Sequence, residues 1–142
     1  MAGILRISEA AALGLHTMAM LAKEKEQRIS NHQIAEALHA SEHHVPKVLQ
    51  RLVKAGLVRS ARGPKGGFVL ARPAKDITLL EVYECIEGPL RPEYCLLDPP
   101  ICDGLHCILG GMVREVTEKF CDYLETTTLA DLAKRIQIPV TA

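Results

Sequence analysis

The stretch that decides the fold covers residues 30–72 and reads SNHQIAEALHASEHHVPKVLQRLVKAGLVRSARGPKGGFVLAR. Ser30, followed three residues later by Gln33, has the sequence of a capping box and predicts the start of a helix. After a turn at residues 39–41, apolar residues recur at helical spacing, and we expect Gly56 to end this second helix. Two short amphipathic helices joined by a tight turn predict a helix-turn-helix unit.

A β-hairpin is predicted directly after the second helix. Apolar residues follow one another or alternate with polar residues at 57–60 and 67–70, as is typical of strands. The residues between them, 62–67, are rich in turn-forming types. Helix, turn, helix and hairpin in this order form a winged helix-turn-helix, whose second helix enters the major groove of DNA. The expected fold class is therefore mainly α with a small β-hairpin wing.

The charge distribution supports a DNA-binding surface. The chain has no net charge, but residues 41–75 hold eight Lys and Arg and one acidic residue, whereas residues 76–142 hold twelve acidic and five basic residues. Phosphate neutralisation needs a local basic face and not a basic whole protein. The alternative, in which these side chains only keep the surface solvated, leaves unexplained why the charge coincides with the motif.

The start of the second helix decides which side chains reach the bases. Ser41 could cap this helix, but Pro46 would crowd its first turn, so the helix either starts later, near His43 or His44, or has a distorted first turn. The candidate DNA contacts are His43, His44, Lys47 and Gln50 for base edges, Arg51 and Lys54 for phosphates, and Arg59, Arg62 and Lys65 in the wing. The adjacent histidines have no Cys or acid at ligand spacing, which argues against a metal site there.

Residues 8–25 predict an amphipathic helix that packs behind the DNA-binding elements. Glu9 and His16 interrupt the apolar run that would otherwise resemble a signal-peptide core. His16 is either a partly buried core histidine or a ligand. No run of apolar residues is long enough to span a bilayer. The chain has five cysteines, an odd number that does not suit a set of disulfides, so we expect a cytoplasmic protein whose cysteines bind metal or sense oxidation.

The C-terminal part combines an irregular loop with one long helix. A short helix is expected at residues 79–87, the proline-containing loop at residues 90–104, and the long helix at residues 105–124. The apolar stripe of the long helix includes Leu105, Ile108, Met112, Val116, Phe120 and Leu124. A winged helix already has a core, so we expect this stripe to pack against a second copy of the chain. Residues 1–76 would then bind DNA, and residues 77–142 would carry the loop and the dimerisation helices.

Three cysteines lie in or next to the irregular loop, in the pattern Cys95-x6-Cys102-x4-Cys107. Thiolates are suitable ligands for iron–sulfur clusters, Zn²⁺ and Cu(I). A structural zinc site normally has four protein ligands with closer cysteine pairs, so the spacing favours a cluster whose fourth ligand comes from elsewhere. The alternative is three free thiols.

Several segments resemble the Rrf-two (Rrf2) family of bacterial transcription regulators, the IscR, NsrR and CymR type. They are RSARGPKGGFVLARP at residues 59–73, ITLLE at 77–81, EG at 87–88 and TLADL at 128–132, with the three-cysteine loop in the family's order. The resemblance covers nearly the whole chain and implies a homodimer that binds a roughly palindromic double-stranded DNA operator.

The resemblance also implies a cofactor. In the cluster-bearing members the loop cysteines hold a [2Fe–2S] or [4Fe–4S] cluster, which purification can remove, and the cluster state sets the affinity for DNA. Other members lack a cluster and respond through protein partners or thiol oxidation.

The resemblance leaves the fourth cluster ligand open. Some relatives use a histidine three residues after the last cysteine, where this chain has Gly110. Others use an acidic residue or a histidine on the first helix of the partner subunit. The corresponding positions here are Ala12, which cannot ligate, and His16, which can. His106, beside Cys107, is the local competitor, so we rank His16 first and His106 second.

We therefore expect a dimeric DNA-binding regulator that senses redox, nitric oxide or iron–sulfur status through a cluster. A cluster-free regulator controlled by thiol oxidation or by a protein partner is the alternative. A winged helix that binds only proteins would not need the basic stretch. An enzyme is not expected, because no acid–base pair or nucleophile accompanies the cysteines.

Overall fold

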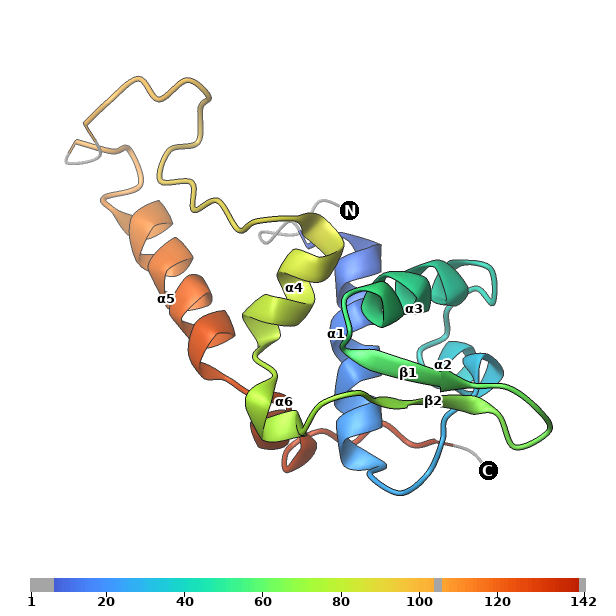
Figure 1. The fold of residues 1–142 in the computed structure, drawn as a ribbon. Coiled ribbons are helices and arrows are strands. Elements are labelled where there is room, and N and C mark those ends of the chain that lie inside the picture. The colour runs from blue at the N-terminus through green and yellow to red at the C-terminus, as the bar shows by residue number, and fades with distance from the viewer. Residues whose placement is uncertain (1–6, 104–105, 141–142) are drawn as a thin grey trace.

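The chain folds into helices and a single hairpin in the part that the structure, a computed structural model, describes: residues 7–103 and 106–140 (Figure 1). The elements are α1 (Glu9–Lys23), α2 (Asn31–Ala37), α3 (His44–Lys54), β1 (Val58–Ala61), β2 (Gly67–Leu70), the 3-10 helix η1 (Ala74–Asp76), α4 (Leu79–Glu87), α5 (Met112–Thr126) and α6 (Leu129–Ala133). The prediction of a mainly helical fold with a small β-hairpin is confirmed.

The helix-turn-helix forms where the local sequence predicts it. Ser30 Oγ accepts a hydrogen bond from the Gln33 amide at 3.2 Å, and Gln33 Oε1 accepts one from the Ser30 amide at 2.9 Å, which completes the capping box of α2. Helix α3 begins at His44, as the position of Pro46 predicts. Ser41 does not cap α3; its hydroxyl accepts from the His43 amide at 3.1 Å and stabilises the preceding turn.

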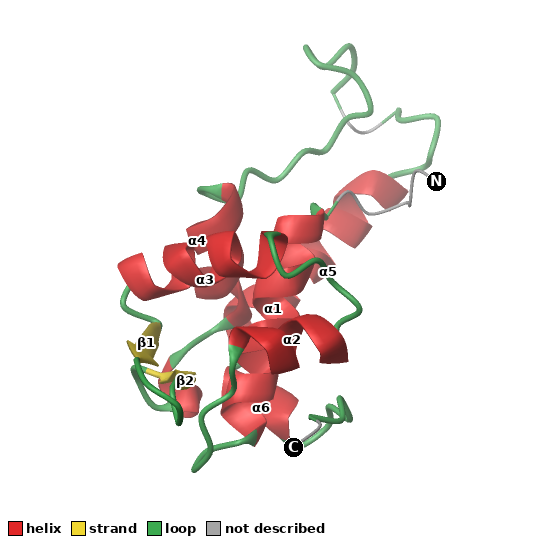
Figure 2. Cartoon of the chain, turned by 90° about the vertical axis from the view of Figure 1, so that its right-hand side faces the viewer, coloured by secondary structure: helices red, strands yellow, loops and turns green. Residues whose placement is uncertain are grey.

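The wing is an antiparallel hairpin that extends from the end of α3 in both ribbon views (Figures 1 and 2). Val58 pairs with Leu70 and Ala61 with Gly67, and an isolated bridge joins Ile29 to the second strand. A Cβ atom at Gly66 would lie 2.5 Å from the Ala61 carbonyl oxygen, so the tight tip requires glycine there.

Helix α1 lies at the centre of the molecule, with α3 and the wing on one side and α4 and α6 on the other (Figure 1). The fully buried core side chains include Met18, Met20, Ile34, Leu49, Leu52, Leu57, Ile77, Val82 and Leu129. Backbone hydrogen bonds from the Leu79 amide to Thr127 O (3.0 Å) and from the Leu129 amide to Ile77 O (2.9 Å) join the start of α4 to the start of α6. The described residues on either side of position 76 therefore share one core.

The prediction of a helix from Leu105 was wrong, because α5 begins only at Met112. Gly110 and Gly111 have φ values of +58° and +82°, a left-handed backbone that cannot continue a right-handed helix. Ile108 therefore lies in a turn before the helix, and Leu105 lies outside the described residues.

The inward face of α4 is formed by three apolar residues. The structure buries Leu79, Val82 and Ile86, whereas Leu80 and Tyr83 are half-buried.

In the described part of the chain, no helix combines the length and the apolar character needed to cross a membrane.

Candidate DNA-binding surface and cysteine loop

Helix α3 separates a buried apolar face from an exposed polar face. Val45, Val48, Leu49 and Leu52 are buried and fix the helix against the core. All predicted base contacts of this helix are exposed: His43, His44, Lys47 and Gln50. The helix therefore presents hydrogen-bonding and cationic groups to solvent on the face that a major groove would meet.

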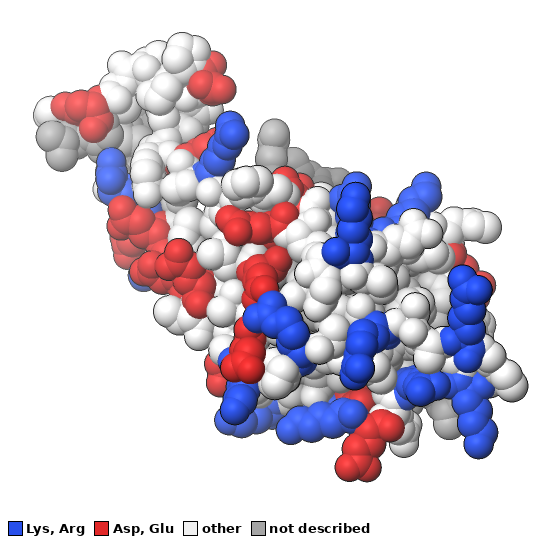
Figure 3. Space-filling view, viewed as in Figure 1, with Lys and Arg blue, Asp and Glu red and all other residues white. Residues whose placement is uncertain are grey.

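The wing continues this basic surface. Arg59, Arg62 and Lys65 are exposed, and Arg28 Nη1 donates a hydrogen bond to the Lys65 carbonyl at 3.4 Å. In the space-filling view Lys and Arg are frequent over α3 and the wing, whereas Asp and Glu predominate over α4 and α5 (Figure 3). The charge separation seen along the sequence is thus a separation in space.

Two candidate DNA contacts have protein partners. His44 Nδ1 lies 3.8 Å from a carboxylate oxygen of Glu9, at the start of α1. Arg51 Nη1 donates to the Ile86 carbonyl at 2.9 Å, so this guanidinium is directed at least partly toward α4. The sequence did not predict either contact, because both join segments far apart in the chain.

The single acidic residue in the basic stretch, Glu42, is also paired. Its carboxylate lies 2.6 Å from Nδ1 of His32, which opens α2. The hydrogen bond and charge of Glu42 raise the pKa of His32, which favours the imidazolium. The pair fixes the turn between α2 and α3 and offsets negative charge beside the DNA-binding face.

The cysteine loop, of which the structure describes residues 89–103 and 106–111, projects with α5 away from the DNA-binding elements (Figures 1 and 2). Hydrogen bonds to side chains of α4 and α5 hold the first part of the loop. The Leu90 amide donates to Glu84 Oε1 at 2.8 Å, and Thr117 Oγ1 donates to the Glu93 carbonyl at 3.0 Å. The Arg114 guanidinium lies 4.5 Å from the centre of the Tyr94 ring, a cation–π contact.

The three cysteines are accessible thiols in this loop. Cys95 and Cys107 are half-buried and Cys102 is exposed. The Leu97 amide donates to Cys95 Sγ at 3.5 Å and the Leu109 amide to Cys107 Sγ at 3.4 Å. The amide of Leu97, followed by that of Ile101, lowers the pKa of Cys95 below its ordinary value.

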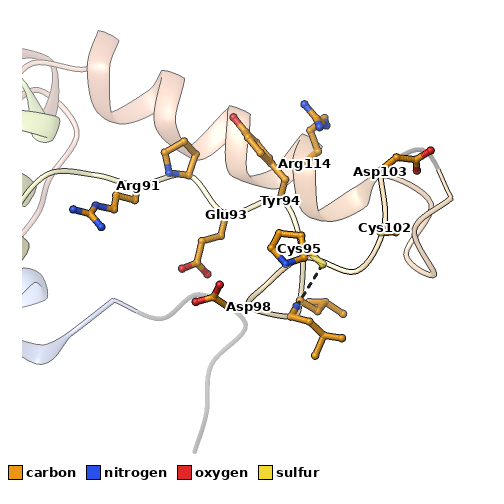
Figure 4. A pocket seen from close by; sticks show the side chains of 12 residues that line it. Arg91, Glu93, Tyr94, Cys95, Asp98, Cys102, Asp103 and Arg114 are labelled. Carbon is orange, nitrogen blue, oxygen red and sulfur yellow. Dashed lines mark hydrogen bonds between the residues drawn. The ribbon is translucent and has the colours of Figure 1, made fainter.

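Cys95 and Cys102 line one hollow of the loop, together with Tyr94 and Arg114 (Figure 4). Backbone N–H groups directed at sulfur and a nearby cation suit thiolate ligands of an iron–sulfur cluster, so the donor chemistry fits this group. The geometry is not assembled, because nowhere in residues 7–103 and 106–140 do three His, Cys, Asp or Glu side chains converge as metal ligands.

The two candidate fourth ligands lie in different places. His16 is exposed on α1, and its Nδ1 is 2.6 Å from the Ala12 carbonyl oxygen. Because a carbonyl can only accept, this contact favours the tautomer with the proton on Nδ1, in which Nε2 has the lone pair that a ligand needs. The structure does not bring His16 to the loop of its own chain. His106 is exposed beside Cys107, with Nδ1 3.5 Å from Asp103 Oδ2.

The stripe on α5 is partly exposed and partly packed. Side-chain exposure is 89% at Ile108, 54% at Met112 and 40% at Val116. Further along, Phe120 makes an edge-to-face contact with Tyr83 of α4, and Leu124 is buried. The first part of α5 and the preceding turn therefore expose large apolar side chains.

The fold and its exposed basic helix define a winged helix-turn-helix DNA-binding protein. The model of the Rrf2 family, described as iron-dependent transcriptional regulators, matches residues 7–135. The chain belongs to the Rrf2 family and is a transcriptional regulator, not an enzyme.

Similar proteins include two named regulators. The chain is 36% identical to the regulator CymR of Bacillus subtilis over 131 residues, which cover 91% of this chain and 90% of CymR. It is 30% identical to the regulator IscR of Erwinia tasmaniensis over 109 residues, which cover 77% of this chain and 66% of IscR.

Solved structures confirm the fold. The structure of Bacillus subtilis CymR, described as the global cysteine regulator, has a TM-score of 0.78 at 31% identity and covers 94% of this chain and 100% of that one. The T. potens IscR structure has a TM-score of 0.69 at 30% identity, with coverages of 92% and 88%. An oxidized form of Staphylococcus aureus CymR has a TM-score of 0.73 at 29% identity, with coverages of 94% and 99%.

Proposed function

We propose that the chain acts as a homodimer that binds a roughly palindromic operator and adjusts its affinity through an iron–sulfur cluster held by Cys95, Cys102 and Cys107. The observation that carries the cluster is the loop itself: it presents three accessible thiols, two of which accept backbone N–H bonds. Thiols in such surroundings form stable thiolate ligands. The cluster, when bound, supplies a centre that gains or loses electrons or reacts with small oxidants.

The homodimer is inferred from the apolar surface of α5 and the turn before it. Ile108, Met112 and Val116 are exposed there, while Arg114–Glu118 and Glu115–Lys119 ion pairs occupy other positions of the same helix. Apolar side chains next to a solvated ionic face are typical of an interface. A second copy of the chain, related by a two-fold axis, would cover the surface with the same residues.

DNA contacts follow from the dimer. Two copies of α3 would enter successive major grooves, with half-sites about one helical turn apart. His43, His44, Lys47 and Gln50 would face base edges, because His43 caps α3 and the other three lie on the exposed face of its first turns. Arg59, Arg62 and Lys65 would extend the contact along the backbone and into the minor groove.

The favoured fourth ligand is His16 of the partner subunit. Its free Nε2 and its exposure suit a ligand from another chain, and its own loop lies elsewhere. His106 is the second choice, because it neighbours Cys107 and has a carboxylate beside one ring nitrogen. A ligand that reaches across the dimer would make cluster state depend on the relative placement of the two DNA-binding units.

A cluster-free regulator switched by thiol oxidation is the second candidate. It is favoured by the backbone N–H groups that lower the pKa of Cys95, which shares a hollow with Cys102, and by the likeness to a CymR structure solved in an oxidized form. In that case the two thiols would respond directly to an oxidant.

One experiment distinguishes the cluster-bearing regulator from the cluster-free regulator. The protein is purified without oxygen, and its visible absorption, iron and acid-labile sulfide are measured for the wild type, each Cys→Ala variant, His16→Ala and His106→Ala. The cluster proposal expects iron and sulfide in the wild type and their loss in each Cys variant. A wild type without iron, or a triple Cys→Ala variant that binds operator as the wild type does, contradicts it. A spectrum altered only by His106→Ala contradicts the cross-subunit ligand alone.

A further inference from the structure

Helices α3 and α4 are joined by two hydrogen bonds that run in opposite directions. Arg51 Nη1 of α3 donates to the Ile86 carbonyl of α4 at 2.9 Å, and the Cys85 thiol of α4 donates to the Arg51 carbonyl at 3.4 Å. Burial raises the pKa of Cys85, which keeps its sulfur protonated and able to donate. One residue of α3 is therefore held by both its side chain and its backbone.

The Ile86 carbonyl has no helical partner to compete with Arg51. It lies in the last turn of α4, where carbonyl groups are left without intrahelical donors. The Leu90 amide, which could have closed another turn onto it, donates to Glu84 Oε1 instead. A cation at a helix C-terminus is also favoured by the helix dipole. The Arg51 side chain thus completes the end of α4.

The same end of α4 is packed against α1. A Cβ atom on Gly14 would lie 3.1 Å from Ile86 Cγ1 and 3.6 Å from Val48 Cγ1, so the three helices approach one another closely at this glycine. The Ser8 hydroxyl, at the cap of α1, donates to the Glu87 carboxylate. Arg51 therefore attaches the recognition helix to a part of the structure that is itself fixed.

We infer that Arg51 is a positioning residue for DNA recognition, which holds α3 in its orientation against α4 and does not neutralise a phosphate. The inference rests on the proposed function in one respect, that α3 is the helix that reads the operator. It replaces the phosphate contact expected from the sequence with a contact inside the protein. Changing the Arg51 side chain should therefore reduce the preference for operator over random DNA and leave the electrostatic attraction to DNA unchanged.

The test compares the salt dependence of operator binding, because each neutralised phosphate adds about 0.9 to the slope of log affinity against log salt. Arg51→Gln should weaken operator binding by about tenfold, the scale of a hydrogen bond to a charged group, with the wild-type slope and unchanged binding to random DNA. Arg51→Lys should not recover the loss, since an ammonium cannot reproduce the guanidinium geometry.

The matched control is Lys54→Gln, which removes an exposed cation from the last turn of the same helix. It should give a shallower slope and weaken operator and random DNA alike. The inference is overturned if Arg51→Gln shows this behaviour, or if Arg51→Lys binds as tightly as the wild type. If wild-type protein does not prefer operator over random DNA, the reading role of α3 fails, and the inference fails with it.

Circular dichroism shows whether Arg51→Gln folds. If it does not fold, variants of Cys85 test the same inference. Cys85→Ala removes the donor to the Arg51 carbonyl, whereas Cys85→Ser keeps one. The inference expects weaker operator binding at an unchanged salt slope for the alanine variant and near wild-type binding for the serine variant. Equal operator binding by both variants and the wild type would overturn it.

Discussion

Gly14 is the position at which the close packing of α1, α3 and α4 can be measured. Gly14→Ala replaces a helical glycine, which stabilises by about 0.5–1 kcal/mol. Its new Cβ at 3.1 Å from Ile86 requires that side chain to shift by a few tenths of an ångström, so the two effects nearly cancel. Gly14→Val adds two methyl groups to the same space, and overpacking of this kind costs about 1–3 kcal/mol.

We therefore expect Gly14→Ala to be as stable as the wild type and Gly14→Val to lose about 1–2 kcal/mol, after allowing for helix propensity. Urea unfolding followed by circular dichroism measures the difference, and thermal unfolding should show a decrease of about 2–4 °C per kcal/mol. Operator binding by Gly14→Val should weaken as well, because the new side chain presses on Val48 of α3. A valine variant with the stability and operator affinity of the alanine variant would refute the close approach of the three helices.

Three further predictions concern the dimer, the wing and pH. Val116→Glu should dissociate the dimer in sedimentation, because a charge buried at the interface costs several kcal/mol; a tight dimer would place the interface elsewhere. Arg62→Ala should weaken operator binding by about 1–3 kcal/mol, mainly at A·T-rich flanks; unchanged affinity at matched salt would remove Arg62 from the DNA contacts. Since Glu42 raises the pKa of His32, the pair should stabilise the fold fully below the ordinary value of 6.5 and lose this effect as the pH rises through the raised pKa. His32→Gln should remove this part of the pH dependence of thermal unfolding above the ordinary value of 6.5, and a profile identical to the wild type would contradict the assignment.

The elements that could be predicted from the sequence are those fixed by local chemistry. The Ser30–Gln33 capping box and the Thr128–Asp131 capping box both form, because they join residues three apart. The late start of α3 follows from the steric demand of Pro46. Local rules of this kind do not depend on the rest of the fold.

The predictions from the sequence were wrong or incomplete where two local signals conflict and where a contact joins residues far apart in the chain. The apolar spacing of residues 105–124 includes Gly110 and Gly111 and predicts one continuous helix, but the left-handed backbone of this glycine pair delays the start of α5 to Met112. The contact between Arg51 and Ile86 joins residues that only the packing of α3 on α4 brings together. A charge on an exposed helix face predicts solvent or phosphate equally well, so no sequence signal identifies such a contact.

The shared core has a consequence for how the protein is made. Helix α1 is synthesised first, yet it packs against α6, and Leu129 of α6 is fully buried. The backbone hydrogen bonds between residues 77–79 and 127–129 also need the C-terminal segment. The native core therefore closes only after α6 has emerged from the ribosome, since contacts this distant in sequence form late.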